Sequence, residues 1–252
     1  MRVLVIDDQL NVEKAMRAIL DRHEVTGVRD PAALPRMLAN EEPFDLAIVD
    51  LRFPLSATTG LTALAILREK SPGTRTIVAT TDEEENRLLY LLAAFQFFEP
   101  RALLPKSADD FTTRAVVEAV GRGAPAPNAD ADPFRSAAAM RPPLLDRVVK
   151  DKKELGIWRE LTRFDKRQEI ANAAHVHPRV LDTFSADKSV AIDVMTGHFP
   201  PRSTAVRPQP AAAAAQAHGA NLINVIHFAR THIQFFTDKE VAALLAAHWR
   251  SH

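Results

Sequence analysis

The chain has 252 residues, 46% of them hydrophobic and 25% charged, which is the composition of a soluble globular protein with room for two domains. It has no cysteine, and this excludes disulfides, thiolate nucleophiles and cysteine metal sites. No stretch approaches the roughly 18 apolar residues that span a bilayer, and the apolar run Val3–Ile6 is too short for a signal peptide. We therefore expect a cytoplasmic protein with no membrane partner.

The formal net charge is zero, but it is unevenly distributed. Residues 1–121 carry 14 basic and 19 acidic side chains, a net charge of −5, and residues 122–252 carry 18 and 13, a net charge of +5. An acidic front half joined to a mildly basic back half fits a regulatory domain attached to a part that meets an anionic partner. The eight glycines form no phosphate-binding loop, and the chain has no serine nucleophile elbow and no HExxH pair. We expect a regulator, not an enzyme.

Short apolar runs alternate with helical patterns in the front half. Strands that are apolar throughout and alternate with helices are typical of a parallel sheet covered on both faces, so a doubly wound α/β domain is predicted. The expected strands are residues 3–6, 45–49, 76–80 and 102–104, and the expected helices are residues 12–21, 62–68, 83–98 and 108–120.

The pattern changes after residue 121. Residues 122–143 are rich in proline, alanine and glycine without a helical stripe, which predicts a linker. An all-α domain is expected over residues 144–252, interrupted by a low-complexity insertion at 199–220. Beyond this insertion we expect two amphipathic helices, the first with an apolar face from Leu222 to Phe236. A capping box, Thr237-Asp238-Lys239-Glu240, opens the second.

Polar and charged residues with a common chemistry follow the strands of the front domain. Because ligands gather at the carboxyl ends of parallel strands, these side chains are expected to share one pocket. Convergent carboxylates suit Mg²⁺, a lysine can pair with phosphoryl oxygens, and a hydroxyl can hydrogen-bond them. The residues are Asp7 and Asp8, Asp50, Thr80 or Thr81, and Lys106.

These motifs resemble the response-regulator receiver family over residues 1–121. VLVIDD resembles its first-strand motif, IVDLRFP its phosphoacceptor strand, IVATT its switch strand and LLPKS its lysine loop. The resemblance implies a flavodoxin-like, five-stranded parallel sheet, Mg²⁺ as the cofactor and a sensor histidine kinase as a partner. It implies Asp50 as phosphoacceptor, Thr80 as switch hydroxyl, Lys106 as phosphate-pairing lysine, and Asp7, Asp8, Asp50 and the backbone carbonyl of Arg52 as metal ligands.

The sequence departs from the family pattern in the parts that couple the pocket to an output. Gly60 lies farther from Asp50 than the glycine of the family does, so the loop between them is lengthened. Pro105 precedes Lys106, whereas the proline of the family follows its lysine. Leu103 stands where the family often has a tyrosine or phenylalanine that changes rotamer on phosphorylation. We expect a complete pocket whose coupling to the output is altered.

Two helices joined by a tight turn are expected in the back half. Residues 168–174 form the first, and Pro178 suits the first position of the second. EIANAAHVHPRVL resembles the LuxR/NarL-type helix-turn-helix core, whose second helix enters the major groove. Asp182 and Asp187 are unfavourable on a helix that faces DNA. The candidate DNA contacts are Lys166, Arg167 and Arg179, with His177 as a cap or backbone contact.

The sequence therefore favours a two-component response regulator that is phosphorylated on Asp50 and controls transcription. The final helices are expected to pack on the helix-turn-helix or to form a homodimer. Two alternatives stay open: a back half that binds a protein partner, and an atypical receiver that responds to a ligand or to dimerisation without phosphorylation. Steep salt dependence of binding would distinguish DNA from a protein partner.

Overall fold

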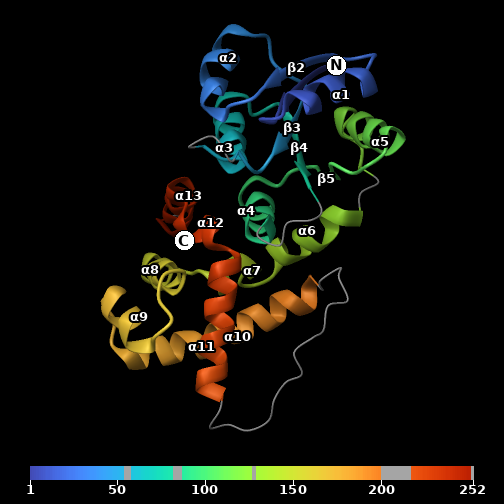
Figure 1. The fold of residues 1–252 in the computed structure, drawn as a ribbon. Coiled ribbons are helices and arrows are strands. Elements are labelled where there is room, and N and C mark those ends of the chain that lie inside the picture. Colours follow the sequence, from blue (N-terminus) through green and yellow to red (C-terminus); the bar gives the residue numbers. More distant parts are fainter. Residues whose placement is uncertain (54–57, 82–86, 127–128, 200–216, 251–252) are drawn as a thin grey trace. The chain divides into compact units, whose positions relative to one another are not determined.

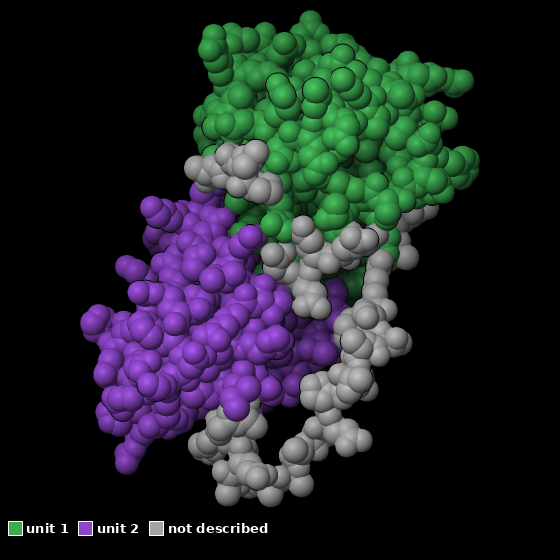
Figure 2. Space-filling view, viewed as in Figure 1, with its two compact units in different colours: residues 1–136 green, residues 137–252 purple. Residues whose placement is uncertain are grey.

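The computed structural model describes residues 1–53, 58–81, 87–126, 129–199 and 217–250. The chain forms two compact units, Met1–Ser136 and Ala137–His252, coloured separately in Figure 2. Within the described ranges, no helix is both long enough and apolar enough to cross a membrane. The expected division into residues 1–121, a linker and residues 144–252 stays a prediction.

The described part of the first unit contains a five-stranded, all-parallel sheet in the order β2-β1-β3-β4-β5, with helices on both faces (Figure 1). The predicted flavodoxin-like fold is therefore confirmed. The strands are β1 (Arg2–Ile6), β2 (Glu24–Val28), β3 (Leu46–Asp50), β4 (Arg75–Thr80) and β5 (Ala102–Pro105). The helices are α1 (Leu10–Ile19), the 3-10 turn η1 (Pro31–Ala33), α2 (Leu34–Asn40), α3 (Gly60–Lys70), α4 (Leu88–Phe98) and α5 (Asp110–Gly121).

The core on one face of the sheet is built from alternate strand residues. Side chains two apart on a strand point to the same face, and Val3 and Val5 of β1 pack together with Val116 and Val120 of α5. Every residue of β3 is buried, so Leu46–Asp50 is covered on both faces. This explains why the central strand is a continuous apolar run that ends abruptly in an aspartate.

Two elements of the first unit differ from the sequence-based expectation. The edge strand β2 was not located, because it pairs with β1 alone and buries only Val25 and Val28 of its five residues. An edge strand with this pattern lacks the apolar run that marks a central strand. The helix expected at residues 83–98 is α4, which begins at Leu88. Residues 82–86 lie outside the described residues.

The expected linker contains helical structure. The 3-10 turn η3 (Ala129–Ala131) and the helix α6 (Asp132–Ala139) follow α5. Pro133 is in the first turn of α6, where its missing N–H has no cost. Phe134 stacks on Phe95 of α4 with ring centroids 5.4 Å apart. This aromatic contact, the Arg135 guanidinium that donates to the Arg101 carbonyl and the buried Ala131 hold a segment whose own apolar pattern is too short to predict a helix.

The second unit is all helical in its described residues, as predicted. Its core surrounds Trp158, which is fully buried and stacks on Phe236 at 4.7 Å, while its indole Nε1–H donates to the Val148 carbonyl at 2.8 Å. The helices are α7 (Leu144–Val148), α8 (Lys152–Leu161), α9 (Arg167–Ala173), α10 (Pro178–His198), α11 (Ala217–Thr231), α12 (Ile233–Thr237) and α13 (Lys239–Arg250).

The end of the chain differs in detail from the expectation. The apolar face from Leu222 to Phe236 belongs to two helices, α11 and α12, which are separated at His232. The cap of α13 is Asp238, whose carboxylate accepts the Glu240 N–H at 2.7 Å. Thr237 does not cap, because its hydroxyl donates to a carbonyl of α12 instead. Most of the predicted insertion, residues 200–216, lies outside the described residues.

Candidate functional site

The parallel register brings the predicted pocket residues to one edge of the sheet. Asp50 is the last residue of β3 and lies opposite Ala79, one residue before the end of β4. Thr80 ends β4 and is buried, whereas Thr81 is exposed. The Lys106 N–H donates to the Thr80 carbonyl at 2.7 Å, which fixes the residue after β5 beside the end of β4.

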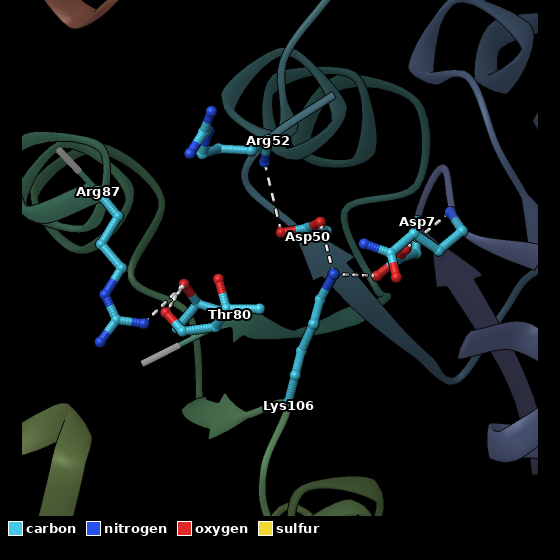
Figure 3. Close-up of polar contacts among 8 residues, drawn as sticks. Asp7, Asp50, Arg52, Thr80, Arg87 and Lys106 are labelled. Atoms are coloured by element: carbon cyan, nitrogen blue, oxygen red, sulfur yellow. Dashed lines mark hydrogen bonds and ion pairs between the residues drawn. The ribbon is translucent and has the colours of Figure 1, made fainter. Parts of the chain in front are cut away.

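Lys106 connects the carboxylates of two strands. Its ammonium Nζ lies 2.7 Å from Asp7 Oδ2 and 2.7 Å from Asp50 Oδ2 (Figure 3). The side chains are 14%, 3% and 10% exposed for Lys106, Asp7 and Asp50 respectively. One half-buried cation therefore neutralises part of the charge of two buried acids.

The ionisation of the pocket is set by opposing effects. Burial raises the pKa of Asp50, and this outweighs the lowering by Lys106. Burial lowers the pKa of Lys106, but the neighbouring Asp50 and Asp7 raise it by more, so the net direction is upward from 10.5. The pocket thus holds a firmly charged lysine against a carboxylate that is costly to ionise, and additional positive charge would relieve that cost.

The acidic residues fit a divalent cation. Ligand atoms of Asp7, Asp8 and Asp50 all lie within 4.8 Å of one another, with Asp8 half-buried and the other two buried. Carboxylate oxygens are the ligands that Mg²⁺ prefers, and one half-buried member leaves room for the waters it retains. The Arg52 N–H approaches Asp50 Oδ1 at 3.4 Å, and the metal-binding role of the Arg52 carbonyl stays a prediction.

The displaced glycine still serves the pocket. The Gly60 N–H donates to the Leu51 carbonyl at 3.1 Å, and a β-carbon at Gly60 would lie 2.0 Å from the Asp50 carbonyl oxygen. No side chain fits at that distance, so only glycine allows the start of α3 to approach the backbone of the acceptor residue. Residues 54–57, between Asp50 and Gly60, lie outside the described residues.

Arg87 lies outside the group of acids and lysine but contacts Thr80, and the sequence motifs did not identify it. Its guanidinium Nη1 donates to Thr80 Oγ1 at 3.1 Å (Figure 3). Arg87 belongs to none of the receiver motifs. In the sequence it is marked only by being a basic residue directly before the apolar run that forms α4.

In the second unit, α9 and α10 are joined by a compact turn. His175 adopts the left-handed conformation with φ +53°, and the Val176 N–H donates to the Ala171 carbonyl at 2.9 Å, which closes α9 as a Schellman motif. His177 is the N-cap of α10, with its Nδ1 accepting the Arg179 N–H at 3.2 Å. The tight turn expected from the sequence is therefore present.

The candidate DNA contacts differ in their ion pairing with acidic residues of the protein and in their exposure. Arg167 forms a two-bond ion pair with Asp182, so its charge is shared between α9 and α10. Lys166 lies 3.3 Å from Glu169 and is largely exposed. Arg179 is exposed on the first turn of α10. Of the two arginines, Arg179 is thus the better placed for an anionic ligand.

Comparisons with known proteins were consistent with this geometry. Residues 3–96 match the family model of the response regulator receiver domain. RcsB from Salmonella enterica serovar Typhimurium, bound to promoter P1flhDC with the phosphomimetic BeF3−, has a TM-score of 0.58 at 18% identity, covering 90% of this chain and 97% of that chain. An RcsB–DNA complex has a TM-score of 0.57 at 18% identity, covering 90% and 98%. No curated protein matches the sequence.

At 18% identity, the similarity to RcsB supports only a shared fold. The family match covers the part of the chain that contains Asp7 and Asp50. The family expectation drawn from the sequence motifs is confirmed for this part. Residues 3–96, which lie in the first unit of the chain, are identified as a response regulator receiver domain.

Proposed function

We propose that the protein is a two-component response regulator in which Asp50 accepts a phosphoryl group from a histidine kinase. The observation that carries the proposal is the pair of 2.7 Å contacts that Lys106 makes with Asp7 and Asp50 in a pocket of three acids. This is the charge arrangement that phosphoryl transfer requires, with a cation at hand for the oxygens that gain charge.

In the proposed reaction, a carboxylate oxygen of Asp50 attacks the phosphorus of a phosphohistidine. An O–P bond forms, the N–P bond breaks, and the imidazole nitrogen takes up a proton. Lys106 pairs with a phosphoryl oxygen, and the Thr80 hydroxyl donates to another. Mg²⁺ held by Asp7, Asp8 and Asp50, with the Arg52 carbonyl, would supply charge neutralisation.

Phosphorylation is tested with a small phosphodonor such as acetyl phosphate, with and without Mg²⁺. The intact mass of the full chain should increase by one phosphoryl group, and the increase should require Mg²⁺. Asp50→Asn should abolish it, whereas Asp21→Asn, at an exposed aspartate outside the pocket, should not. An unsubstituted protein that gains no mass would refute the phosphorylation and would favour the receiver that acts without it.

For the output we propose regulation of transcription by DNA binding through α9 and α10. The closed turn at His175 and the capped start of α10 support this arrangement, since they hold two helices in the order that a helix-turn-helix uses. Lys166, Arg179 and the cap His177 are the proposed backbone contacts, and Arg167 would contribute after giving up Asp182. A homodimer would match the two-fold symmetry of such sites.

The decisive measurement is recovery of bound genomic fragments, followed by affinity for a recovered fragment at several salt concentrations. Arg179→Ala should lower this affinity, and Arg163→Ala, at an exposed arginine paired with Glu160 on α8, should leave it within about twofold. Sedimentation of the phosphorylated and unphosphorylated chain reports the proposed dimer.

A protein partner is the second candidate, and the charge of α10 favours it. Along this helix Asp187 and Asp193 are exposed and Asp182 is half-buried, against the exposed cation of Arg179. An excess of acids on the second helix opposes DNA phosphates. Binding that does not weaken with salt, or no recovered DNA, would support this candidate and refute the first.

A further inference from the structure

One hydrogen bond joins the phosphorylation pocket to the start of α4. Thr80 is the last residue of β4 and is 5% exposed, and Arg87 is the N-cap residue of α4, directly before Leu88. Figure 3 shows the guanidinium of Arg87 reaching the Thr80 hydroxyl, with Nη1 and Oγ1 3.1 Å apart. Because Arg87 has helical backbone angles (φ −77°, ψ −19°), a shift of this residue also shifts the first turn of the helix.

The Thr80 hydroxyl has a proton left for a second partner. A hydroxyl carries one proton and two lone pairs, and Arg87 occupies a lone pair. The oxygen lies 3.5 Å from the Thr81 carbonyl, at the limit for donation. The hydroxyl can therefore donate to a phosphoryl oxygen while it accepts from Arg87. A cationic donor on one side of a hydroxyl also strengthens its donation on the other.

The position on β5 at which the receiver family often has an aromatic residue cannot provide this coupling through a hydrogen bond. Leu103 of β5 lies opposite Val78 and is 5% exposed, and its aliphatic side chain can neither donate nor accept a hydrogen bond. A coupling through hydrogen bonds of the Thr80 hydroxyl therefore needs a polar neighbour other than Leu103. Among the described residues, Arg87 is the polar side chain shown to bond that oxygen.

We propose that Arg87 is a positioning residue that couples phosphorylation of Asp50 to α4 through Thr80. When the hydroxyl moves toward a phosphoryl oxygen, the guanidinium follows it and the first turn of α4 is rearranged. This inference rests on the proposed phosphorylation of Asp50 and adds the route by which the pocket reaches the surface of the domain.

The test is hydrogen exchange of the backbone amides of residues 88–98 in the full chain, before and after treatment with acetyl phosphate and Mg²⁺. The unsubstituted protein should show a phosphorylation-dependent change in exchange rate. In Arg87→Ala the extent of phosphorylation should stay within about twofold, while the change in exchange should fall about tenfold, equivalent to about 1.4 kcal/mol of lost coupling.

Two further variants separate coupling from simple loss of packing. Thr80→Val removes the hydroxyl from the other side of the bond, so the double variant with Arg87→Ala should lose no more of the α4 response than either single variant. Arg68→Ala is the matched control, because Arg68 donates to the Phe97 carbonyl at the far end of α4 at 2.9 Å. It should keep the phosphorylation-dependent change.

The outcomes distinguish the two proposals. A phosphorylated Arg87→Ala protein with an unchanged α4 response overturns the coupling and leaves phosphorylation standing. No phosphorylation of the unsubstituted protein overturns both. If the alanine variant does not fold, Arg87→Lys gives the comparison, since it keeps the charge and shortens the reach; a full response in this variant together with a full response in Thr80→Val would also refute the coupling.

Discussion

Replacing Lys106 by alanine leaves two carboxylates in the pocket without their shared cation. The ammonium contacts Asp7 and Asp50 at 2.7 Å each, and the two acids are 3% and 10% exposed. Removing one partner of a buried ion pair typically costs about 3–5 kcal/mol. Because the Lys106 side chain is itself 14% exposed, water reaches part of the site, and we expect a cost near the lower end, about 3 kcal/mol.

The assay must report the first unit alone. Trp158 lies in the second unit, so tryptophan fluorescence would follow the wrong part of the chain. Amide exchange of β1 and β3, the core strands of the first unit, follows its unfolding and should accelerate by more than about a hundredfold in Lys106→Ala. Lys70→Ala is the control, because its contact with Glu69 joins two exposed side chains, and it should leave the exchange of β1 and β3 unchanged.

The pH dependence follows from the directions of the pKa shifts. In the unsubstituted protein the raised pKa of Lys106 means that its stabilisation is fully present below about 10.5 and is lost as the pH rises through the folded-state value. In Lys106→Ala, the pKa of Asp50, which burial already raises, rises further. The cost of the substitution should therefore be large at neutral pH and shrink as the pH falls and the carboxyl takes up a proton.

Mg²⁺ provides an independent check on the same reasoning. A divalent cation among the carboxylates replaces the missing positive charge, so it should restore part of the stability of Lys106→Ala. Equal costs for Lys106→Ala and Lys70→Ala, or a cost that is independent of both pH and Mg²⁺, would show that the pocket is not held by its charges.

Three further substitutions test other parts of the structure. Gly60→Ala should destabilise the first unit by about 2 kcal/mol or more, because its β-carbon would meet backbone at 2.0 Å, whereas Gly73→Ala meets nothing within 4 Å and should be neutral in thermal unfolding. Trp158→Ala should cost about 3–5 kcal/mol in denaturant unfolding of the second unit, and a cost below about 1 kcal/mol would contradict its place in the core. Asp182→Ala releases Arg167 and should tighten DNA binding at low salt; unchanged binding would exclude Arg167 as a phosphate contact.

The positions of the pocket residues could be predicted because a parallel sheet leaves little choice. Once β3 and β4 are recognised as buried strands, Asp50 and Thr80 must emerge at the same edge, and Lys106 follows at the end of the next strand. The strand β2 could not be located in the same way, since an edge strand buries two of its five residues and its sequence shows no apolar run.

Contacts that depend on individual side chains could not be predicted from the pattern of apolar residues along the sequence. The helix α6 lies in a segment that reads as a linker, and Phe134 at its start packs within the first unit by stacking against Phe95. Lys188 is a charged residue on α10, yet it is 1% exposed and pairs with Glu154 at 2.8 Å and with the Arg147 carbonyl at 2.9 Å. Periodicity alone gives no sign that this lysine joins three helices in the core.

The departures of this sequence from the receiver-family pattern concern the proposed coupling and not the residues proposed for the chemistry. The acids, the hydroxyl and the lysine come together as the motifs imply, and even the displaced Gly60 makes the approach to Asp50 that the pocket needs. The differences lie in the residues proposed to connect the pocket to the rest of the domain. Leu103 is aliphatic where the family often has an aromatic residue, and Arg87 donates a hydrogen bond to the Thr80 hydroxyl. If Asp50 is phosphorylated as proposed, its effect needs a contact that connects the Thr80 hydroxyl to the rest of the domain, and the hydrogen bond from the Arg87 guanidinium is such a contact.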